Sequence, residues 1–323
     1  MSAVQAKPRL ALLTSSFPFG KGETFLETEL PFLAARFQVE IVPTWAMAAD
    51  FQTHRDLPEG VVVRRDLAER FQYGLGSNVR NMWGSLRHLK TWGRLLRAER
   101  PLLPRRSWAL KRLFYTAAQG MALAAVLQSD ASLRQADVLY SYWLTTAALA
   151  AALAKRAGHP GLAVSRAHRF ELYVDVANGR YQPFQAEMVQ SLDWILPISD
   201  QGRDYLRRLY PAQQAKIATR RLGVKGAAQP LMQPSDSQMR LVSRSRLVPL
   251  KQIDLVIAAL ALCPMPVHWT HLGGGQLEAE LATAGGGAAC PHHLGNNGKS
   301  AKRANFALLP DTASGFVFEC EPC

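Results

Sequence analysis

The chain has 323 residues, of which 48% are hydrophobic and 20% are charged. This composition excludes disordered, fibrous and collagen-like proteins. The length predicts two hydrophobic cores, because a single core stops growing at roughly 250 to 300 residues. Four cysteines argue against a disulfide-stapled secreted domain. The net charge of +13 predicts an anionic partner.

The apolar runs are short. The stretch that follows Lys7 and Arg9 is interrupted by three hydroxyl residues at 14–16, unlike the core of a signal peptide. The most apolar segment, 147–154, is far shorter than the roughly 18 residues of a membrane span. We therefore expect a cytoplasmic protein.

An apolar strand, a loop rich in Gly, Pro and Ser, and a helix alternate along much of the first 210 residues. The first set is a strand at 10–14, a loop at 15–22 and a helix at 23–36. Further strands are predicted at 39–43, 137–141, 162–167 and 194–198, and further helices at 145–157, 182–192 and 199–209. This alternation predicts an α/β fold with a parallel sheet covered on both faces.

Positive charge is concentrated between residues 78 and 114, where ten Lys and Arg accompany one acid, Glu99. Four of the cations recur at intervals of three, four and three residues, which places them on one helical stripe. They are Arg87, Lys90, Arg94 and Arg97. The tryptophans nearby are Trp83, Trp92 and Trp108. A solvated helix face is one explanation; we expect contact with an anionic membrane, on its inner face, because so much like charge is costly without a partner.

The strand and helix pattern loosens after Tyr210 and then resumes. New strands are predicted at 239–243 and 267–272, and new helices at 253–262 and 276–282. We expect a first domain at 1–225, a linker at 226–238, an incomplete second domain at 239–282 and an irregular tail at 283–323.

Two cations follow the first predicted strand of the second domain. In SRSRLVPLK, Arg246 and Lys251 lie between that strand and the next helix. Fixed cations at this point could converge on one diphosphate and stabilise the charge of a leaving group. A solvated loop with ordinary surface charges explains the spacing equally well.

Four blocks in colinear order, from about residue 9 to about residue 282, resemble retaining glycosyltransferases of the GT-B fold. The blocks are LLTSSFPFGKGETFLETELPFLAARF, SRAHRFELYVDVANGRYQPF, LDWILPISDQGRDYLRRLYP with RLGV, and SRLVPLKQIDLVIAAL with HWTHLGGGQLEAEL. They are similar to the family 4 group, which works on lipopolysaccharide and capsular sugars. The resemblance implies two Rossmann-like domains, a nucleotide-sugar donor, a lipid-linked or polysaccharide acceptor, and no cofactor or metal.

The same resemblance assigns roles to residues of both domains. Arg246 and Lys251 would bind the donor diphosphate. Gly273 and Gly275 would form a tight loop facing the nucleotide, for which a plain turn is the alternative. In the first domain, the acceptor-side loop would contain Gly20 and Gly22, with Glu23 opening the helix behind them.

His168 stands where this family places a histidine that faces the transferred sugar, at the end of the predicted strand LAVSRAH. The resemblance therefore implies a catalytic role, although a lone histidine at a strand end is often structural. Two neighbours depart from the family's usual Gly and Asp. They are Arg169, which puts bulk where a backbone would come close, and Glu171.

The family also carries two glutamates eight positions apart late in the second domain, and no two glutamates of this chain have that spacing. We interpret this as a reading-frame shift near residues 274–290 that truncated the second domain. Such a domain would be too small to bury its apolar faces. We expect weak donor binding and little or no turnover.

Three other patterns are weaker. CPHH at 290–293 and CEPC at 320–323 contain possible zinc ligands without a surrounding framework, and GNNGKS at 295–300 lacks the first glycine of a phosphate loop. The alternative is a non-catalytic basic protein that binds anionic membrane or nucleic acid. No nucleic-acid-binding module is recognisable, and we expect no nucleic-acid partner. An epimerase acting on nucleotide sugars would share the strand and helix pattern, but would need a dinucleotide fingerprint after the first strand.

Overall fold

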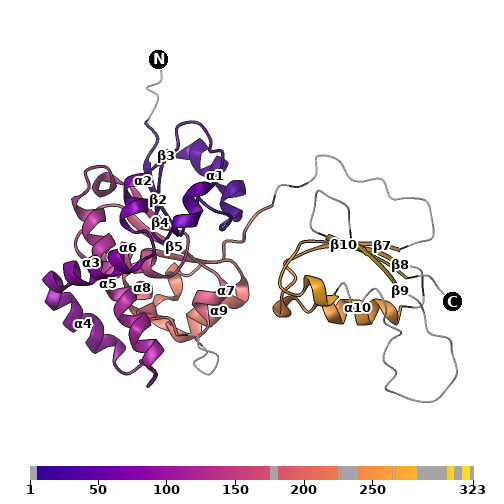
Figure 1. The fold of residues 1–323 in the computed structure, drawn as a ribbon. Helices are drawn as coiled ribbons and strands as arrows, with labels where there is room; N and C mark the ends of the chain where they lie inside the picture. Colours follow the sequence, from indigo (N-terminus) through magenta and orange to yellow (C-terminus); the bar gives the residue numbers. More distant parts are fainter. Residues whose placement is uncertain are drawn as a thin grey trace. The chain divides into compact units, whose positions relative to one another are not determined.

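The computed structural model describes residues 6–174, 181–224, 226, 239–263, 265 and 267–281, together with the backbone of 304–308 and 315–320. The chain divides into two compact units, Met1–Gly226 and Ala227–Cys323. We name them unit 1 and unit 2, and both are drawn in Figure 1.

Unit 1 is built on a six-stranded parallel sheet of order β3-β2-β1-β4-β5-β6. The strands are β1 (Arg9–Thr14), β2 (Gln38–Pro43), β3 (Val62–Val63), β4 (Val138–Ser141), β5 (Leu162–Ala167) and β6 (Trp194–Pro197). Leu10 of β1 is in register with Val39 on one side and Val138 on the other. The order therefore reverses at β1, as in doubly wound folds, which bind ligands at that switch point.

Helices cover both faces of this sheet. The α-helices are α1 (Phe25–Arg36), α2 (Arg65–Arg70), α3 (Leu75–Ser85), α4 (Leu89–Glu99), α5 (Ser107–Ser129), α6 (Thr146–Arg156), α7 (Arg169–Leu172), α8 (Gln185–Ser191) and α9 (Asp200–Leu209). The 3₁₀ turns are η1 (Ala48–Gln52), η2 (Leu86–His88), η3 (Leu133–Gln135) and η4 (Pro211–Lys216). Leu12 of β1 packs in one core with Leu26 of α1, whereas Leu13 belongs to a second core with α5 and α6. Because β1 is buried on both faces, its central residues LALL are continuously apolar.

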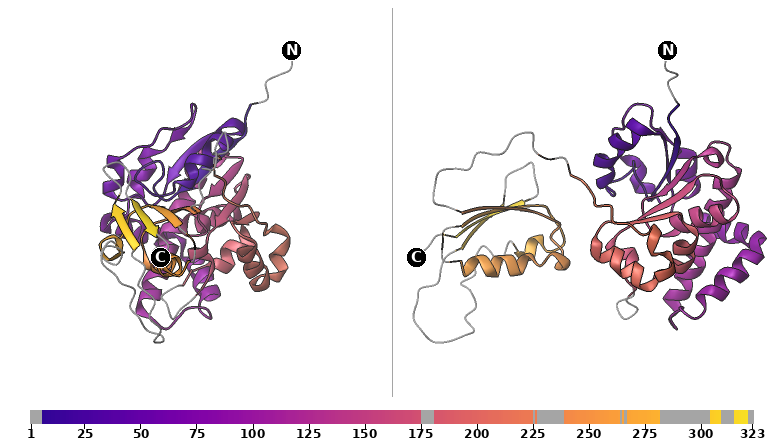
Figure 2. Two further views of the ribbon diagram at one scale, coloured as in Figure 1. Left: turned by 90° about the vertical axis from the view of Figure 1, so that its right-hand side faces the viewer. Right: turned by 180° about the vertical axis from the view of Figure 1, so that it is seen from behind.

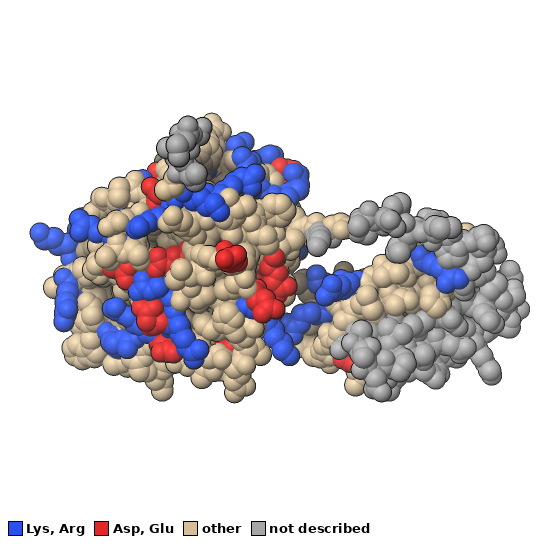
Figure 3. Space-filling view, turned by 90° about the horizontal axis from the view of Figure 1, so that it is seen from above, with Lys and Arg blue, Asp and Glu red and all other residues tan. Residues whose placement is uncertain are grey.

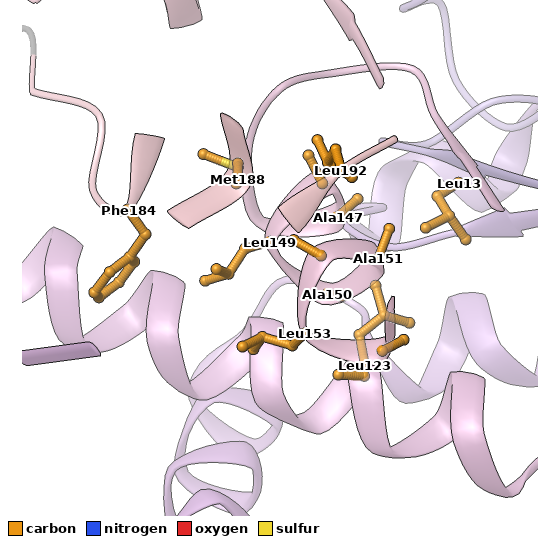
Figure 4. Packing of buried hydrophobic residues seen from close by; sticks show 14 of the residues in the cluster. Leu13, Leu123, Ala147, Leu149, Ala150, Ala151, Leu153, Phe184, Met188 and Leu192 are labelled. Atoms are coloured by element: carbon orange, nitrogen blue, oxygen red, sulfur yellow. The ribbon is translucent and has the colours of Figure 1, made fainter. Parts of the chain in front are cut away.

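The larger core is centred on α6, where every residue from 147 to 154 is buried. Figure 4 shows Leu149 of this helix near Met188 of α8. The alanines of α6 and Gly120 of α5 allow the two helices to approach closely. A Cβ added at Gly120 would lie 2.8 Å from Leu149 Cδ2.

Most predicted elements of unit 1 are present, with shifted ends. Helix α1 begins at Phe25 rather than residue 23, because Glu23 has a φ of +54° and is not helical. Helix α8 begins at Gln185 rather than 182. Strand β3 was not predicted, since two residues are too few for a periodic signal.

Unit 2 has a four-stranded mixed sheet of order β7-β8-β10-β9. Its elements are β7 (Met239–Arg244), η5 (Pro249–Lys251), α10 (Ile253–Ala261), β8 (Val267–Leu272), β9 (Ala304–Leu308) and β10 (Gly315–Cys320). Strands β7 and β8 are parallel, whereas β10 runs antiparallel to β8 and β9. An irregular tail was expected from residue 283, but β9 and β10 lie in it. Their sequences, ANFAL and GFVFEC, contain the aromatic and β-branched residues that favour strands.

Helix α10 lies along one face of the unit 2 sheet, as Figure 2 shows. Its sequence, IDLVIAALA, is apolar around most of its circumference. Ile253 and Leu260 are buried against Trp269 of β8, whereas Leu255 and Val256 remain exposed. A helix that is apolar all round is normally covered on both sides. The described part of unit 2 therefore covers only one side of α10.

Candidate functional site

The carboxyl ends of β1, β2 and β4 meet at one edge of the unit 1 sheet, where a cavity of about 300 Å³ opens. We name it the switch-point cavity, because it lies where the strand order reverses between β1 and β4. Its walls come from these strand ends and from parts of α5, α6 and α7. They carry several hydroxyl groups, the aromatic rings of Trp45, Trp143 and Phe170, and the guanidinium of Arg112.

The loop that follows β1 is held in place by Glu23. This buried carboxylate accepts hydrogen bonds from the backbone N–H groups of Ser15, Ser16 and Phe17 at 2.8, 2.9 and 2.8 Å. It also accepts one from Trp143 Nε1 at 2.7 Å. Glu23 was predicted as part of the acceptor-side loop, opening the helix behind it. The structure instead gives it a positioning role, because it ties the β1 loop to an aromatic wall of the cavity.

The two glycines of this loop differ in their surroundings. Gly20 has a φ of +70°, and a Cβ there would lie 2.4 Å from Asp50 Oδ1. Its N–H donates to the carbonyl oxygen of Asp50 at 3.0 Å, which packs the loop against η1. A Cβ on Gly22 would meet only Ser16 Oγ, at 3.7 Å. Neither glycine lines the switch-point cavity.

Trp143 connects the β1 loop, His168 and the cavity. Its ring centroid lies 4.3 Å from that of His168 and 5.7 Å from that of Phe170. His168 is buried at the end of β5, as the predicted strand LAVSRAH requires. The exposed side chain of Arg169 directs its bulk to solvent. His168 therefore lies behind one wall of the cavity.

His168 is oriented by Glu171, one turn along the chain. The backbone N–H of His168 donates to Glu171 Oε1 at 2.7 Å, and its Nδ1 lies 2.9 Å from the same oxygen. If Nδ1 carries the proton of the neutral ring, Nε2 is a hydrogen-bond acceptor. The Nε2 of His168, Glu171 Oε2 and the hydroxyl of Tyr142 are buried without a hydrogen-bond partner within the part of the chain that the structure describes. Such groups are uncommon in folded proteins.

In unit 2, the loops that follow β7 and β8 lie against each other. The N–H of Leu247 donates to the carbonyl oxygen of Gly274 at 3.0 Å. Gly273 has a φ of +133°, and a Cβ there would lie 2.1 Å from the carbonyl oxygen of Ser245. A Cβ on Gly275 would lie 2.4 Å from the carbonyl oxygen of Leu247. Close backbone approach between the loops thus accounts for both glycines, which were predicted to face the nucleotide.

Arg246 and Lys251 are both exposed, in the β7 loop and in η5. Neither forms an ion pair with any residue that the structure describes. Beneath them, His271 is buried, with Nδ1 2.8 Å from Ser243 Oγ and Nε2 3.1 Å from the carbonyl oxygen of Ser245. No sequence pattern indicated a role for His271. Its hydrogen bonds fix the start of the loop that carries Arg246.

No protein-family model matches this chain, and no match to a curated protein sequence is found. Solved structures do resemble it. One is the lipopolysaccharide outer core galactosyltransferase WaaB in its apo form, a GT-B protein, with a TM-score of 0.52 at 12% identity over 85% of this chain and 63% of that chain. The chain has the GT-B fold.

Two further similarities have lower TM-scores. The apo structure of OtsA aligns with a TM-score of 0.46 at 13% identity, over 82% of this chain and 65% of that chain. A UDP-N-acetylglucosamine 2-epimerase from Rickettsia bellii aligns with a TM-score of 0.40 at 8% identity, over 85% and 64%. The chain therefore spans less than two thirds of the length of each of these structures. The similarity to WaaB and the six-stranded parallel sheet confirm the predicted α/β, GT-B-like fold class.

The basic segment of this GT-B chain spans most of α3, then η2, α4 and the start of α5, and the 3₁₀ turn η2 interrupts the predicted stripe at Arg87. Arg87, Lys90 and Arg97 are exposed. Arg94 is not free, because its Nη1 lies 2.5 Å from Glu187 Oε2. The stripe is therefore shorter than predicted. Figure 3 shows Lys and Arg along the left-hand margin of unit 1, the side on which Figure 1 draws α4.

Glu99, the single acid of this segment, is buried. It accepts hydrogen bonds from the Tyr181 hydroxyl at 2.6 Å and from the Phe184 N–H at 2.9 Å. Burial raises its pKa, against the effect of these two bonds. The carboxylate thus anchors α4 from inside and does not offset the charge on the surface.

The tryptophans of this segment were expected to lie on one interfacial surface, but the structure separates them. Trp92 is buried and donates to Ser85 Oγ at 3.2 Å, and Trp108 packs at the edge of the core. Trp83 is 70% exposed. It continues an exposed apolar row on α3, at intervals of four residues, that we name the α3 stripe. The stripe consists of Leu75, Val79 and Trp83.

The described residues contain neither a metal-site cluster nor a membrane-spanning helix. There, no three His, Cys, Asp or Glu side chains are grouped as a metal site requires. No helix there combines the length and apolarity needed to cross a bilayer. The CPHH and GNNGKS sequences, and all of CEPC except the backbone of Cys320, lie outside the described residues.

Proposed function

We propose that this chain is a glycosyltransferase that moves a sugar from a nucleotide-sugar donor to an acceptor bound by unit 1. The observation that carries the proposal is the switch-point cavity beside His168, in a chain of the GT-B fold. Cavities at the switch points of doubly wound sheets are the usual ligand sites of such folds.

The two units would divide the chemistry. In unit 2, Arg246 and Lys251 would bind the donor diphosphate, since both are exposed next to the carboxyl end of β7. Their fixed charges would stabilise the negative charge that develops on the leaving diphosphate. In unit 1, His168 would face the transferred sugar from behind the cavity wall; its buried Nε2 has no hydrogen-bond partner among the described residues. Retention of configuration at the transferred carbon is a further part of the proposal, supported by the resemblance of the four sequence blocks.

We also propose that the acceptor is carried by a lipid or a growing surface polysaccharide, and that unit 1 contacts an anionic membrane. The α3 stripe exposes apolar side chains, including Trp83, beside a hollow of about 580 Å³. Arg70, Arg80 and Arg87 line this hollow. Exposed apolar residues flanked by cations are typical of surfaces that bind anionic membranes.

The first test is donor binding by the purified 323-residue chain. UDP-, GDP- and ADP-linked hexoses would be titrated in a calorimeter, and at least one is expected to bind. Because charge-assisted hydrogen bonds are strong, the double variant Arg246→Gln, Lys251→Gln should weaken binding at least about tenfold. Arg240→Gln, at the opposite end of β7, is the matched control. Because weak binding is expected of this chain, the titrations extend to weak affinities, and no detectable binding of any of these donors would refute the proposal.

A second measurement separates transfer from epimerisation. Transfer releases the nucleoside diphosphate and depends on an acceptor, whereas an epimerase returns an isomeric nucleotide sugar and needs none. Chromatography of the nucleotide products distinguishes the two. The rate separately tests the prediction that this chain turns over little, because ready transfer would contradict the proposed truncation without affecting the assigned function.

A further inference from the structure

Arg112 supplies the charge of the switch-point cavity. It lies on α5, is half-buried and lines the cavity wall. Its Nη2 donates to Gln182 Oε1 at 3.1 Å, and Gln182 Nε2 in turn donates to the carbonyl oxygen of Leu144 at 2.9 Å. Gln182 is buried. The guanidinium is therefore held in place by a neutral amide that is itself fixed to the backbone.

Several other partly buried arginines of unit 1 have carboxylate partners, whereas Arg207 donates to the carbonyl oxygen of Ile217. Arg64 pairs with Asp130 at 2.8 Å, and Arg166 pairs with Glu29 at 2.9 Å. Arg112 forms no ion pair with any carboxylate that the structure describes, and no acidic side chain lines its cavity. Burial accordingly lowers the pKa of Arg112, with no opposing effect. Since arginine stays charged inside proteins, an anionic ligand would compensate it.

Some hydroxyl groups of the cavity are also available, although those of Thr14 and Thr44 donate to backbone carbonyls. Thr116 lies one turn along α5 from Arg112 and is only 5% exposed. Its hydroxyl nevertheless forms no hydrogen bond to any described residue. Thr145 and Thr146, at the start of α6, line the same cavity. The first turn of α6 contains no acidic residue, so the positive end of its dipole adds to the field of Arg112.

Aromatic rings complete the walls. Trp45 and Phe170 line the cavity and are 41% and 55% exposed, and Trp143 lies between Phe170 and His168. Flat apolar rings combined with a few convergent polar groups are typical of small-molecule sites. At about 300 Å³, the cavity suits a ligand of monosaccharide size.

We propose that the switch-point cavity binds a sugar that carries an anionic group, a phosphate or a carboxylate. Arg112 is the counter-charge, the hydroxyls around it accept or donate the remaining hydrogen bonds, and Trp45 and Phe170 hold the ring. The inference rests on the proposed function in one respect, namely that this sugar is the acceptor.

The test compares neutral and anionic sugars on the full chain without any donor. Glucose, glucose 1-phosphate, glucose 6-phosphate, glucuronate and inorganic phosphate would each be titrated by saturation-transfer NMR or calorimetry. At least one anionic sugar should bind about tenfold or more tightly than both glucose and inorganic phosphate. Whether a sugar phosphate or glucuronate binds best identifies the anionic group. Equal binding of glucose and all three anionic sugars would overturn the inference.

Variants locate the binding. Arg112→Gln should abolish the advantage of the anionic sugar, whereas Lys111→Gln, an exposed neighbour on the same helix, should leave it unchanged. Arg112→Lys keeps a charge and should keep part of the advantage, and circular dichroism verifies that each variant is folded. If Arg112→Gln does not fold, Trp45→Ala should weaken the binding of the anionic sugar. Full retention of the advantage in a folded Arg112→Gln protein, or unchanged binding in Trp45→Ala, would place the ligand elsewhere.

This result is independent of the donor test. Anionic sugar binding without donor binding would refute the glycosyltransferase and leave the cavity assignment intact. Donor binding and transfer to neutral sugars alone would do the reverse.

Discussion

Replacing Glu23 by alanine tests the structure of the acceptor side most directly. The carboxylate accepts three backbone hydrogen bonds and one from Trp143, and it is 8% exposed. Alanine would leave the buried N–H groups of Ser16 and Phe17 without their acceptor. Each unsatisfied buried group costs about 1 to 3 kcal/mol. We therefore expect Glu23→Ala to lower the free energy of unfolding of unit 1 by about 3 to 5 kcal/mol.

Glutamine at this position retains one acceptor oxygen, so Glu23→Gln should cost about half as much as alanine. The matched control is Glu27→Ala. Glu27 lies one turn further along the chain and pairs at the surface with Arg55 at 3.1 Å, with 53% of its side chain exposed. Loss of such a surface pair costs about 0 to 1 kcal/mol.

The assay is urea denaturation followed by tryptophan fluorescence. Six of the seven tryptophans lie in unit 1, so the signal reports mainly on that unit. Because Glu23 also holds Trp143 at the cavity, the alanine variant should bind acceptor sugars more weakly. A free energy of unfolding within 1 kcal/mol of the wild type, or no larger a loss than for Glu27→Ala, would refute the positioning role.

Three further predictions concern other parts of the chain. Arg64 lowers the pKa of Asp130, so this carboxylate stabilises the fold fully above its unfolded pKa of about 3.9, and the stabilisation is lost as the pH falls through its lower folded pKa. Arg64→Met should therefore lower the free energy of unfolding by about 2 kcal/mol at pH 7 and flatten the acid unfolding curve below pH 4. An unchanged curve would contradict the pairing. Gly275→Ala should destabilise unit 2 while leaving unit 1 intact, because its Cβ would meet a backbone oxygen at 2.4 Å; proteolysis followed by mass spectrometry would show whether cleavage increases only beyond residue 226. Trp83→Ser should weaken co-sedimentation with anionic vesicles about tenfold, because burial of a large apolar side chain contributes about 1.5 to 3 kcal/mol. Trp194 is also exposed, and Trp194→Ser should leave co-sedimentation unchanged. Equal effects of the two substitutions would argue against the α3 stripe.

The sequence by itself determined the alternation of strands and helices. The run LALL of β1 is apolar at consecutive positions, as a strand buried on both faces requires, so its assignment needs only local information. The positions of His168 at a strand end and of Arg246 after a strand follow from the same local pattern. The segment from 44 to 136 was less readable. Its longest helix, α5, is buried over most of its length and lacks a clear amphipathic period.

The tertiary structure alone decided what several of these residues do. Glu23 and Trp143 are 120 positions apart, and Arg112 and Gln182 are 70 apart, so no local pattern predicts their hydrogen bonds. The sequence presents Glu99 as one acid among ten cations, and only packing reveals that it is buried. Likewise, Arg112 is one more cation of the basic segment until the fold places it in the switch-point cavity. Residue type and spacing define local elements, whereas a binding site depends on which distant elements the sheet order brings together.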